Sequence, residues 1–303
     1  MRVSKSLRLL GRWGIGAAIA LMLCLPATGA EQFNLETTRS EAEKGNAEAQ
    51  FLLGRAYLHG EGLPLDPAKA LSLFRKAADQ GNARAQHNLG SMYFEGIGVG
   101  RDEREGAKWI RKAAEQGAAL AQDALGTLCV RDLGVPKDCK QGAKWYRKAA
   151  EQGLVDAEYH LGQLYYFGDE GLEKNYMEAA KWIKSAANHN NLWAQNTLGV
   201  MYQQGLGVEK DPGEAVSWFS KAAERGDAKA QSNLAEMYSE GSGVERNLPK
   251  AYQWLTLSAE QNEQTAMRLL VGLRPLMTPE EIAAGEQLLE QFKIGKARAS
   301  AAR

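Results

Sequence analysis

The chain has little cysteine and no block of like charge, and each shortage argues against a class of function. Lys plus Arg and Asp plus Glu both total 37, so the formal net charge is zero. Because no basic patch or charge run stands out, we expect no electrostatic binding to nucleic acid. The 44% hydrophobic and 24% charged residues are typical of a folded globular protein. The three cysteines are Cys24, Cys129 and Cys139.

Motifs for catalysis, cofactors and metals are also missing. The four histidines form no His-x-x-x-His or Cys/His spacing of the kind that binds zinc: His59, His87, His160 and His189. No serine or carboxylate lies in a nucleophile motif. We therefore expect no catalytic, cofactor-binding or metal-binding residues, although an active site assembled only in space stays open as an alternative.

Long hydrophobic runs are confined to the start of the chain. An apolar run at residues 15–25 follows four basic residues and precedes Pro26 to Ala30. This order is typical of a secretory signal peptide cleaved after Ala30, and the run is too short for a good transmembrane helix. We expect residues 1–30 to be removed, leaving a periplasmic or secreted protein with no stable membrane insertion. An uncleaved anchor is the alternative.

What the chain does contain is a unit of about 36 residues, repeated six times. A fixed period of this length predicts a solenoid, in which each unit packs on its neighbours and the array exposes one long surface. That organisation favours binding over catalysis. The units span residues 45–80, 81–116, 117–152, 153–189, 190–225 and 226–261.

Each unit predicts two helices, here named helix A and helix B. Helix A shows residues recurring at a spacing of three to four, as in Gln50, Leu53 and Tyr57. A polar N-cap residue precedes it and a Gly-x-Gly turn ends it. Helix B begins after a second cap and carries an apolar stripe. Five units place a tryptophan in that stripe, which we interpret as packing between helices: Trp109, Trp145, Trp182, Trp218 and Trp254.

This pattern resembles the SEL-one-like repeat family, a relative of the tetratricopeptide repeats. The fifth unit shows the motif almost intact, in Leu198, Gly199, Tyr202, the turn at residues 205–208, Asp211 and the helix B residues 218–223. The resemblance implies an all-α fold, a right-handed α/α superhelical solenoid of six helix-turn-helix repeats, with an adaptor role. It also implies that such bacterial proteins are often exported and act in envelope assembly, signalling or host contact.

Both ends of the array and its middle depart from the repeat. We expect residues 31–44 to form a partial cap, residues 262–292 to form capping helices, and residues 293–303 to be a flexible basic tail. The third unit has Cys129 for the helix A tyrosine and Asp132 for a turn glycine, and the fourth has an extra residue in its turn. These changes predict local distortion between residues 128 and 175.

Cys129 and Cys139 lie in the same unit, at the end of helix A and the start of helix B. A disulfide between them would tie the two helices together, and an exported compartment would permit it. Two free buried thiols, or a redox role, are the alternatives.

One stripe of helix A varies between units where the rest of the pattern repeats. Numbered from the first residue of a unit, positions 4, 7, 11 and 14 share a helix face. Variation in a repeated framework is typical of a recognition surface, and relatives of this family bind ligands on the concave helix A side. Drift on a solvated face and packing against neighbouring helices are the alternatives. The candidate partner-binding residues are Phe51, Arg55, Arg84, His87, Phe94, Tyr159, Gln163, Tyr166, Trp193 and Asn196.

We therefore predict an exported, monomeric, non-catalytic scaffold, adaptor or regulator of envelope proteins. Its partner would be a protein or peptide, docked on the concave helix A surface as an extended segment or a helix. Two alternatives remain: a secreted factor that engages host-cell proteins, and a hydrolase of peptidoglycan or β-lactams.

Overall fold

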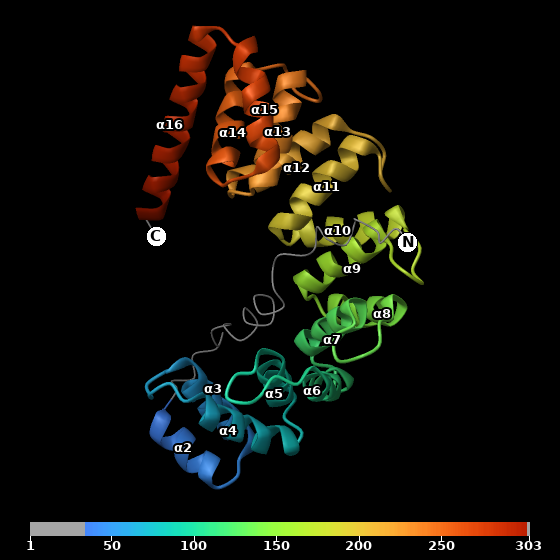
Figure 1. The fold of residues 1–303 in the computed structure, drawn as a ribbon, viewed down its shortest axis with the longest axis vertical. Helices are drawn as coiled ribbons and strands as arrows, with labels where there is room; N and C mark the ends of the chain where they lie inside the picture. Colours follow the sequence, from blue (N-terminus) through green and yellow to red (C-terminus); the bar gives the residue numbers. More distant parts are fainter. Residues whose placement is uncertain (1–33, 302–303) are drawn as a thin grey trace. The chain divides into compact units, whose positions relative to one another are not determined.

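The computed structural model describes residues 34–301, which form helices and turns (Figure 1). The predicted signal peptide and Cys24 lie outside these residues. Within residues 34–301 there is no strand, only an isolated bridge between Asp169 and Leu172. The predicted all-α fold is therefore confirmed.

All six units contain the two predicted helices, each 13 residues long. The A helices are α3 (Ala47–His59), α5 (Ala83–Glu95), α7 (Ala119–Arg131), α9 (Val155–Phe167), α11 (Leu192–Gln204) and α13 (Ala228–Glu240). The B helices are α4 (Pro67–Asp79), α6 (Glu103–Glu115), α8 (Cys139–Glu151), α10 (Tyr176–Asn188), α12 (Pro212–Glu224) and α14 (Leu248–Glu260).

The chain divides into two compact parts between Glu173 and Lys174. The first part holds α2 (Leu35–Glu43) to α9, and the second holds α10 to α16 (Pro279–Ala301). Within each part, a helix A packs against helix B of its own unit and against helix B of the unit before it (Figure 1). The same two contacts, of helix A with its own helix B and with the preceding one, are thus repeated within each part.

Helix ends follow the predicted caps. Asn46 Oδ1 accepts a hydrogen bond from the Ala49 amide at 2.9 Å, and Gly60 ends α3 in the left-handed region at φ 71°. Asp132, which replaces the equivalent glycine in the third unit, adopts the same conformation at φ 59° and ψ 48°. Aspartate tolerates this region better than most residues. The third unit therefore keeps its turn.

The expected distortion is found in the fourth unit alone. Gly168 ends α9 at φ 61° and ψ 168°, outside the left-handed helical region that Gly60 adopts. The extra residue of this turn is accommodated by the Asp169–Leu172 bridge, in which each backbone amide donates to the other residue's carbonyl, at 2.9 and 2.8 Å.

In four units the centre of the A–B contact is a glycine facing a large side chain: Gly54, Gly90, Gly126 and Gly199, while the sixth unit has Ala235 there. A Cβ atom at Gly199 would lie 2.6 Å from the Phe219 ring, and one at Gly90 would lie 2.6 Å from Ile110. Both large side chains are fully buried. The tryptophan just before each lies nearer the surface: Trp218 is 7% exposed, while Trp145 and Trp182 are half-buried. The residue after the tryptophan is packed deepest. Three of the five tryptophans, Trp109, Trp218 and Trp254, are nevertheless buried between helices as predicted, and only Trp145 and Trp182 are half-buried.

Glutamines join successive units through the core. Gln86 Nε2 donates to the Ala78 carbonyl of the preceding helix B at 3.0 Å, and Gln116 Nε2 donates to Gln86 Oε1 at 2.6 Å. The same two bonds recur around Gln50, Gln122 and Gln231. Buried amides are thereby satisfied at each junction. Helix α2 takes the helix B role for the first unit, because Gln50 Nε2 reaches the Ala42 carbonyl at 3.2 Å.

The C-terminal end is closed by α15 (Gln264–Leu273), a short 3₁₀ turn η2 (Arg274–Leu276) and α16. Val271 of α15 stands where helix A of the other units has glycine or alanine, and it is 76% exposed. Helix α16 packs on α14 instead, with the rings of Trp254 and Phe292 5.2 Å apart.

The predicted start of α16 is confirmed, but its predicted end is wrong. Glu281 N donates to Thr278 Oγ1 at 3.2 Å and Glu281 Oε2 accepts from Thr278 N at 2.9 Å, which is a capping box. The helix continues to Ala301, through residues expected to form a flexible tail. Alanine, lysine and arginine favour helix here, and Lys293 Nζ pairs with Glu260 at 2.7 Å.

Candidate partner-binding surface

Three of the ten candidate residues are buried rather than facing an open groove. Phe51 is 4% exposed and packs on Phe74, with ring centroids 5.9 Å apart. Phe94 is buried over Gly106, where a Cβ atom would lie 2.6 Å from its ring, and His87 is also buried. These residues serve the alternative role, packing against neighbouring helices.

The two candidate arginines stay at the surface. Arg84 is exposed, forms an ion pair with Glu48 of the preceding unit, and lies 4.7 Å from the centroid of the Phe51 ring. Arg55 is half-buried, with Nη2 3.9 Å from a carboxylate oxygen of Glu61. Both side chains remain able to contact a partner.

The α9 surface is an accessible aromatic group formed by three candidates, Tyr159, Gln163 and Tyr166, together with Phe167. All four are at least partly exposed. Gln163 Nε2 donates to the Tyr159 hydroxyl, and the rings of Tyr166 and Phe167 meet edge to face at 5.0 Å. Sequence reasoning missed Phe167, although it is an aromatic where the other five units have a polar or charged residue.

In the second part of the chain, Trp193 is the most exposed candidate. Its exposed fraction is 50%, which is high for so large an apolar side chain. Asn196 lies three residues further along α11 and accepts a hydrogen bond from Asn233 Nδ2 of the next unit at 2.9 Å. Trp193 is thus available to a partner, while Asn196 also joins two units.

A buried carboxylate joins two units in the first part of the chain. Asp123, only 1% exposed, accepts a hydrogen bond from His160 Nδ1 at 2.8 Å. Burial by itself would lower the pKa of His160, but the charge and hydrogen bond of Asp123 outweigh it, so the pKa lies above its ordinary value. Burial lowers the pKa of His87, only partly offset by Asn88 and Asp123.

Sequence reasoning missed the Asp123–His160 pair, although the positions of the two residues in successive units could have indicated it. The two residues stand 37 apart, at position 7 of one unit and position 8 of the next, as do Asn196 and Asn233. Polar residues at these two positions in successive units predict a contact. Among residues 34–301, no group of three or more His, Cys, Asp or Glu is placed to hold a metal ion.

The predicted disulfide is wrong, because both cysteines are free and buried. Burial raises the pKa of the Cys129 thiol, and burial followed by the nearby Asp169 carboxylate raises that of Cys139 to about 11. Asp169 accepts a hydrogen bond from Lys137 Nζ at 3.0 Å. Thiols with such high pKa values stay protonated at neutral pH and are poor nucleophiles.

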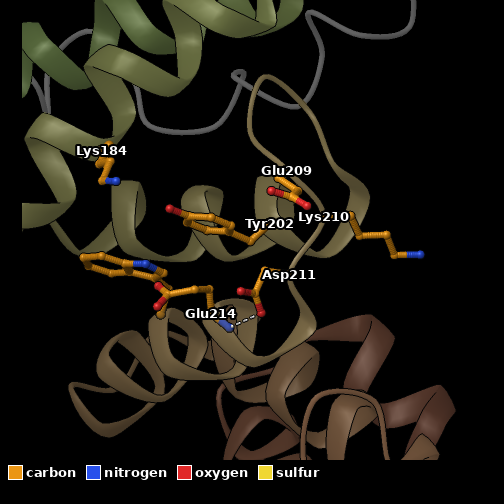
Figure 2. Close-up of a pocket in the computed structure, with 7 residues that line it drawn as sticks. Lys184, Tyr202, Glu209, Lys210, Asp211 and Glu214 are labelled. Atoms are coloured by element: carbon orange, nitrogen blue, oxygen red, sulfur yellow. Dashed lines mark hydrogen bonds between the residues drawn. The ribbon is translucent and has the colours of Figure 1, made fainter.

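A depression of about 450 Å³ lies in the second part of the chain (Figure 2). It is formed by residues of α10, α11 and α12 and of the turn between the last two. Asp211 caps α12 there, accepting from the Glu214 amide at 3.0 Å. The lining residues are Lys184, Tyr202, Glu209, Lys210, Asp211, Glu214 and Trp218. None was among the candidates, because Tyr202 and Trp218 belong to the repeated framework.

No helix within residues 34–301 has the length and apolarity needed to cross a membrane.

Comparison with known proteins gives one consistent result. The Sel1 repeat family matches six segments, residues 47–82, 83–117, 119–154, 155–191, 194–227 and 228–263. A Sel1 repeat protein from Oxalobacter formigenes is 35% identical, over 79% of this chain and 95% of that chain, with a TM-score of 0.67. A protective antigen of uropathogenic Escherichia coli with an SLR fold is 29% identical, over 85% of this chain and 70% of that one, with a TM-score of 0.39. No curated protein matches.

Proposed function

Because the chain belongs to the Sel1 repeat family, whose members generally mediate protein–protein interactions, we propose that it is an exported scaffold or adaptor of envelope proteins. Solenoids of this family are typically non-catalytic, and we extend that property to this chain. The partner is a protein or peptide that contacts exposed helix A side chains.

The observation that carries the proposal is the exposure of aromatic side chains that the repeat does not require. Trp193 is half exposed, and Tyr159, Tyr166 and Phe167 of the α9 surface are partly exposed. Tyrosine and tryptophan are enriched among residues that dominate binding energy at interfaces. Exposed aromatics on helices also suit the docking of an extended peptide or a helix.

The structure narrows the surface first predicted from the sequence. Phe51, His87 and Phe94 are buried, so they support the helices behind the surface rather than contact a partner. Arg55 and Arg84 remain as polar neighbours. The binding residues we propose are therefore Arg55, Arg84, Tyr159, Gln163, Tyr166, Phe167, Trp193 and Asn196.

The test is photo-crosslinking in living cells, with a photoreactive residue placed at Tyr159 or at Trp193. Lys144, exposed on helix B α8, is the matched control. We expect one discrete partner to be captured from both helix A positions and not from Lys144. Capture from Lys144 alone, or from no position, would contradict the proposed surface.

Export is proposed from the N-terminal leader and needs its own test. We expect the chain to be recovered from the periplasm or the culture medium, lacking residues 1–30. Recovery mainly in the medium would favour a secreted factor, and recovery of the intact leader in the cytoplasm would contradict export.

A further inference from the structure

In three units of the first part of the chain, the tyrosine at position 13 of the unit, which lies on helix A, has an arginine from the preceding helix B beside it. Arg39 Nη2 donates to the Tyr57 hydroxyl at 3.3 Å, and Arg147 Nη2 donates to that of Tyr165 at 2.8 Å. Arg75 makes the same bond to Tyr93. Each pair is 18 residues apart, so a guanidinium on this tyrosine is part of the repeated design.

A lysine from the same unit lies over the ring of two position-13 tyrosines, as a second cation at Tyr57 and as the only one at Tyr238. Lys69 Nζ lies 5.2 Å from the centroid of the Tyr57 ring, and Lys250 Nζ lies 5.0 Å from that of Tyr238. A cation over an aromatic face is attracted by the ring's quadrupole. Tyrosines at position 13 are therefore sites that attract cations.

Tyr202 is the exception. The residue 18 positions before it is Lys184 instead of arginine, and Glu214 stands where Lys69 and Lys250 do. Within residues 34–301, the Tyr202 side chain has neither a hydrogen bond nor a cation over its ring. The site that a guanidinium occupies in three other units is open here.

The open site coincides with the depression shown in Figure 2. Its three carboxylates, Glu209, Asp211 and Glu214, outnumber its two ammonium groups, Lys184 and Lys210. Trp218 also lines it, is 7% exposed, and has an indole N–H without a partner in the described chain. The lining thus carries one more negative than positive charge and includes two aromatic rings, and the Tyr202 hydroxyl can accept from an incoming donor, whereas the indole N–H can only donate.

We propose that this depression binds the guanidinium of an arginine side chain from a protein partner. The guanidinium donates to the Tyr202 hydroxyl, as Arg39, Arg75 and Arg147 do within the chain, and pairs with Glu209 or Glu214. Charge-assisted bonds of this kind are the stronger ones, and the planar fork of arginine matches a carboxylate. The site lies outside the helix A stripe, so its occupancy does not depend on the surface proposed above.

The test uses the leaderless chain and a blocked Gly-Gly-Arg-Gly-Gly peptide, followed by NMR of the backbone amides of residues 209–211, 213 and 214, because Pro212 has no amide proton. The same peptide with citrulline in place of arginine is the matched probe, because citrulline keeps the shape and loses the charge. We expect saturable shifts at these amides with the arginine peptide, and an affinity at least about tenfold lower with citrulline.

Variants of the protein complete the test. Lys184→Arg restores the arginine found in the other units, so we expect it to fill the site and abolish the shifts. Glu214→Gln should weaken binding, whereas Lys144→Arg, on the exposed face of α8, should leave it unchanged. The proposal is overturned if no saturable shift occurs, if citrulline binds equally well, or if Lys184→Arg binds as the parent does. Failure here leaves the crosslinking result for helix A unaffected.

Discussion

The ammonium group of Lys221 lies 3.7 Å from the centroid of the Trp218 ring, three residues earlier on the same helix. Lys112 over Trp109, at 4.1 Å, and Lys148 over Trp145, at 4.2 Å, repeat the arrangement. Residues three apart are neighbours on a helix surface. The lysine of each Trp-x-x-Lys motif therefore covers the side of the indole that helix packing leaves near the surface.

Substitution of Trp218 by alanine should lower the free energy of unfolding by about 3–5 kcal/mol, because a large buried side chain is replaced by a cavity. Chemical denaturation would measure the loss. Lys221→Ala removes only the covering cation and should cost about 0.5–1 kcal/mol. A negligible change for Trp218→Ala would show that the indole contributes little to packing.

Gly199→Ala should destabilise the second part of the chain by about 1–3 kcal/mol, since its Cβ atom would lie 2.6 Å from the Phe219 ring. Gly272→Ala in α15 is the matched control. No heavy atom lies within 4 Å of a Cβ atom there, so we expect a gain of about 0.5–1 kcal/mol from helix propensity. Thermal melting of both variants tests the pair, and equal effects would contradict the packing.

The Asp123–His160 bond should make stability depend on pH. The pKa of His160 is raised in the folded chain above its ordinary 6.5, so protonated His160 favours folding. That contribution is fully present below about pH 6.5 and is lost as pH rises through the folded pKa. His160→Gln should therefore lower the melting temperature more at pH 5.5 than at pH 8.5.

The control for this prediction is Asp123→Asn, which should lower the pKa of His160 when measured by NMR titration. His87 acts in the opposite sense, since its lowered pKa favours folding at higher pH. If His160→Gln lost the same stability at both pH values, protonation of His160 would not contribute to folding, and the prediction would be contradicted.

Both thiols should resist modification in the folded protein. Cys129 and Cys139 are buried and their pKa values are raised, so a thiol reagent at pH 8 should react only after denaturation. Unfolding without reductant should then release both thiols. Absence of titratable thiol in the unfolded, unreduced chain would instead indicate a disulfide.

The sequence predicted the helices and their caps well, because a repeated unit shows the same local signals six times. It was less reliable for side chains between units. Helical spacing placed Phe51 and Phe94 on one face of helix A, but only the packed structure shows that neighbouring helices cover them. The Asp123–His160 contact depends on the register between units, which no single unit contains. The tail after Lys293 lacked an apolar pattern, yet its residue types favour helix.

Val271 limits how this array can change in length. Helix B approaches helix A closely only over glycine or alanine, and the last helix A carries a branched side chain at that position. A helix B added after α15 could not pack closely on it unless Val271 were replaced by glycine or alanine. We therefore expect duplication or loss of whole units to take place before α15, so that the array changes in length from within while its C-terminal end is kept.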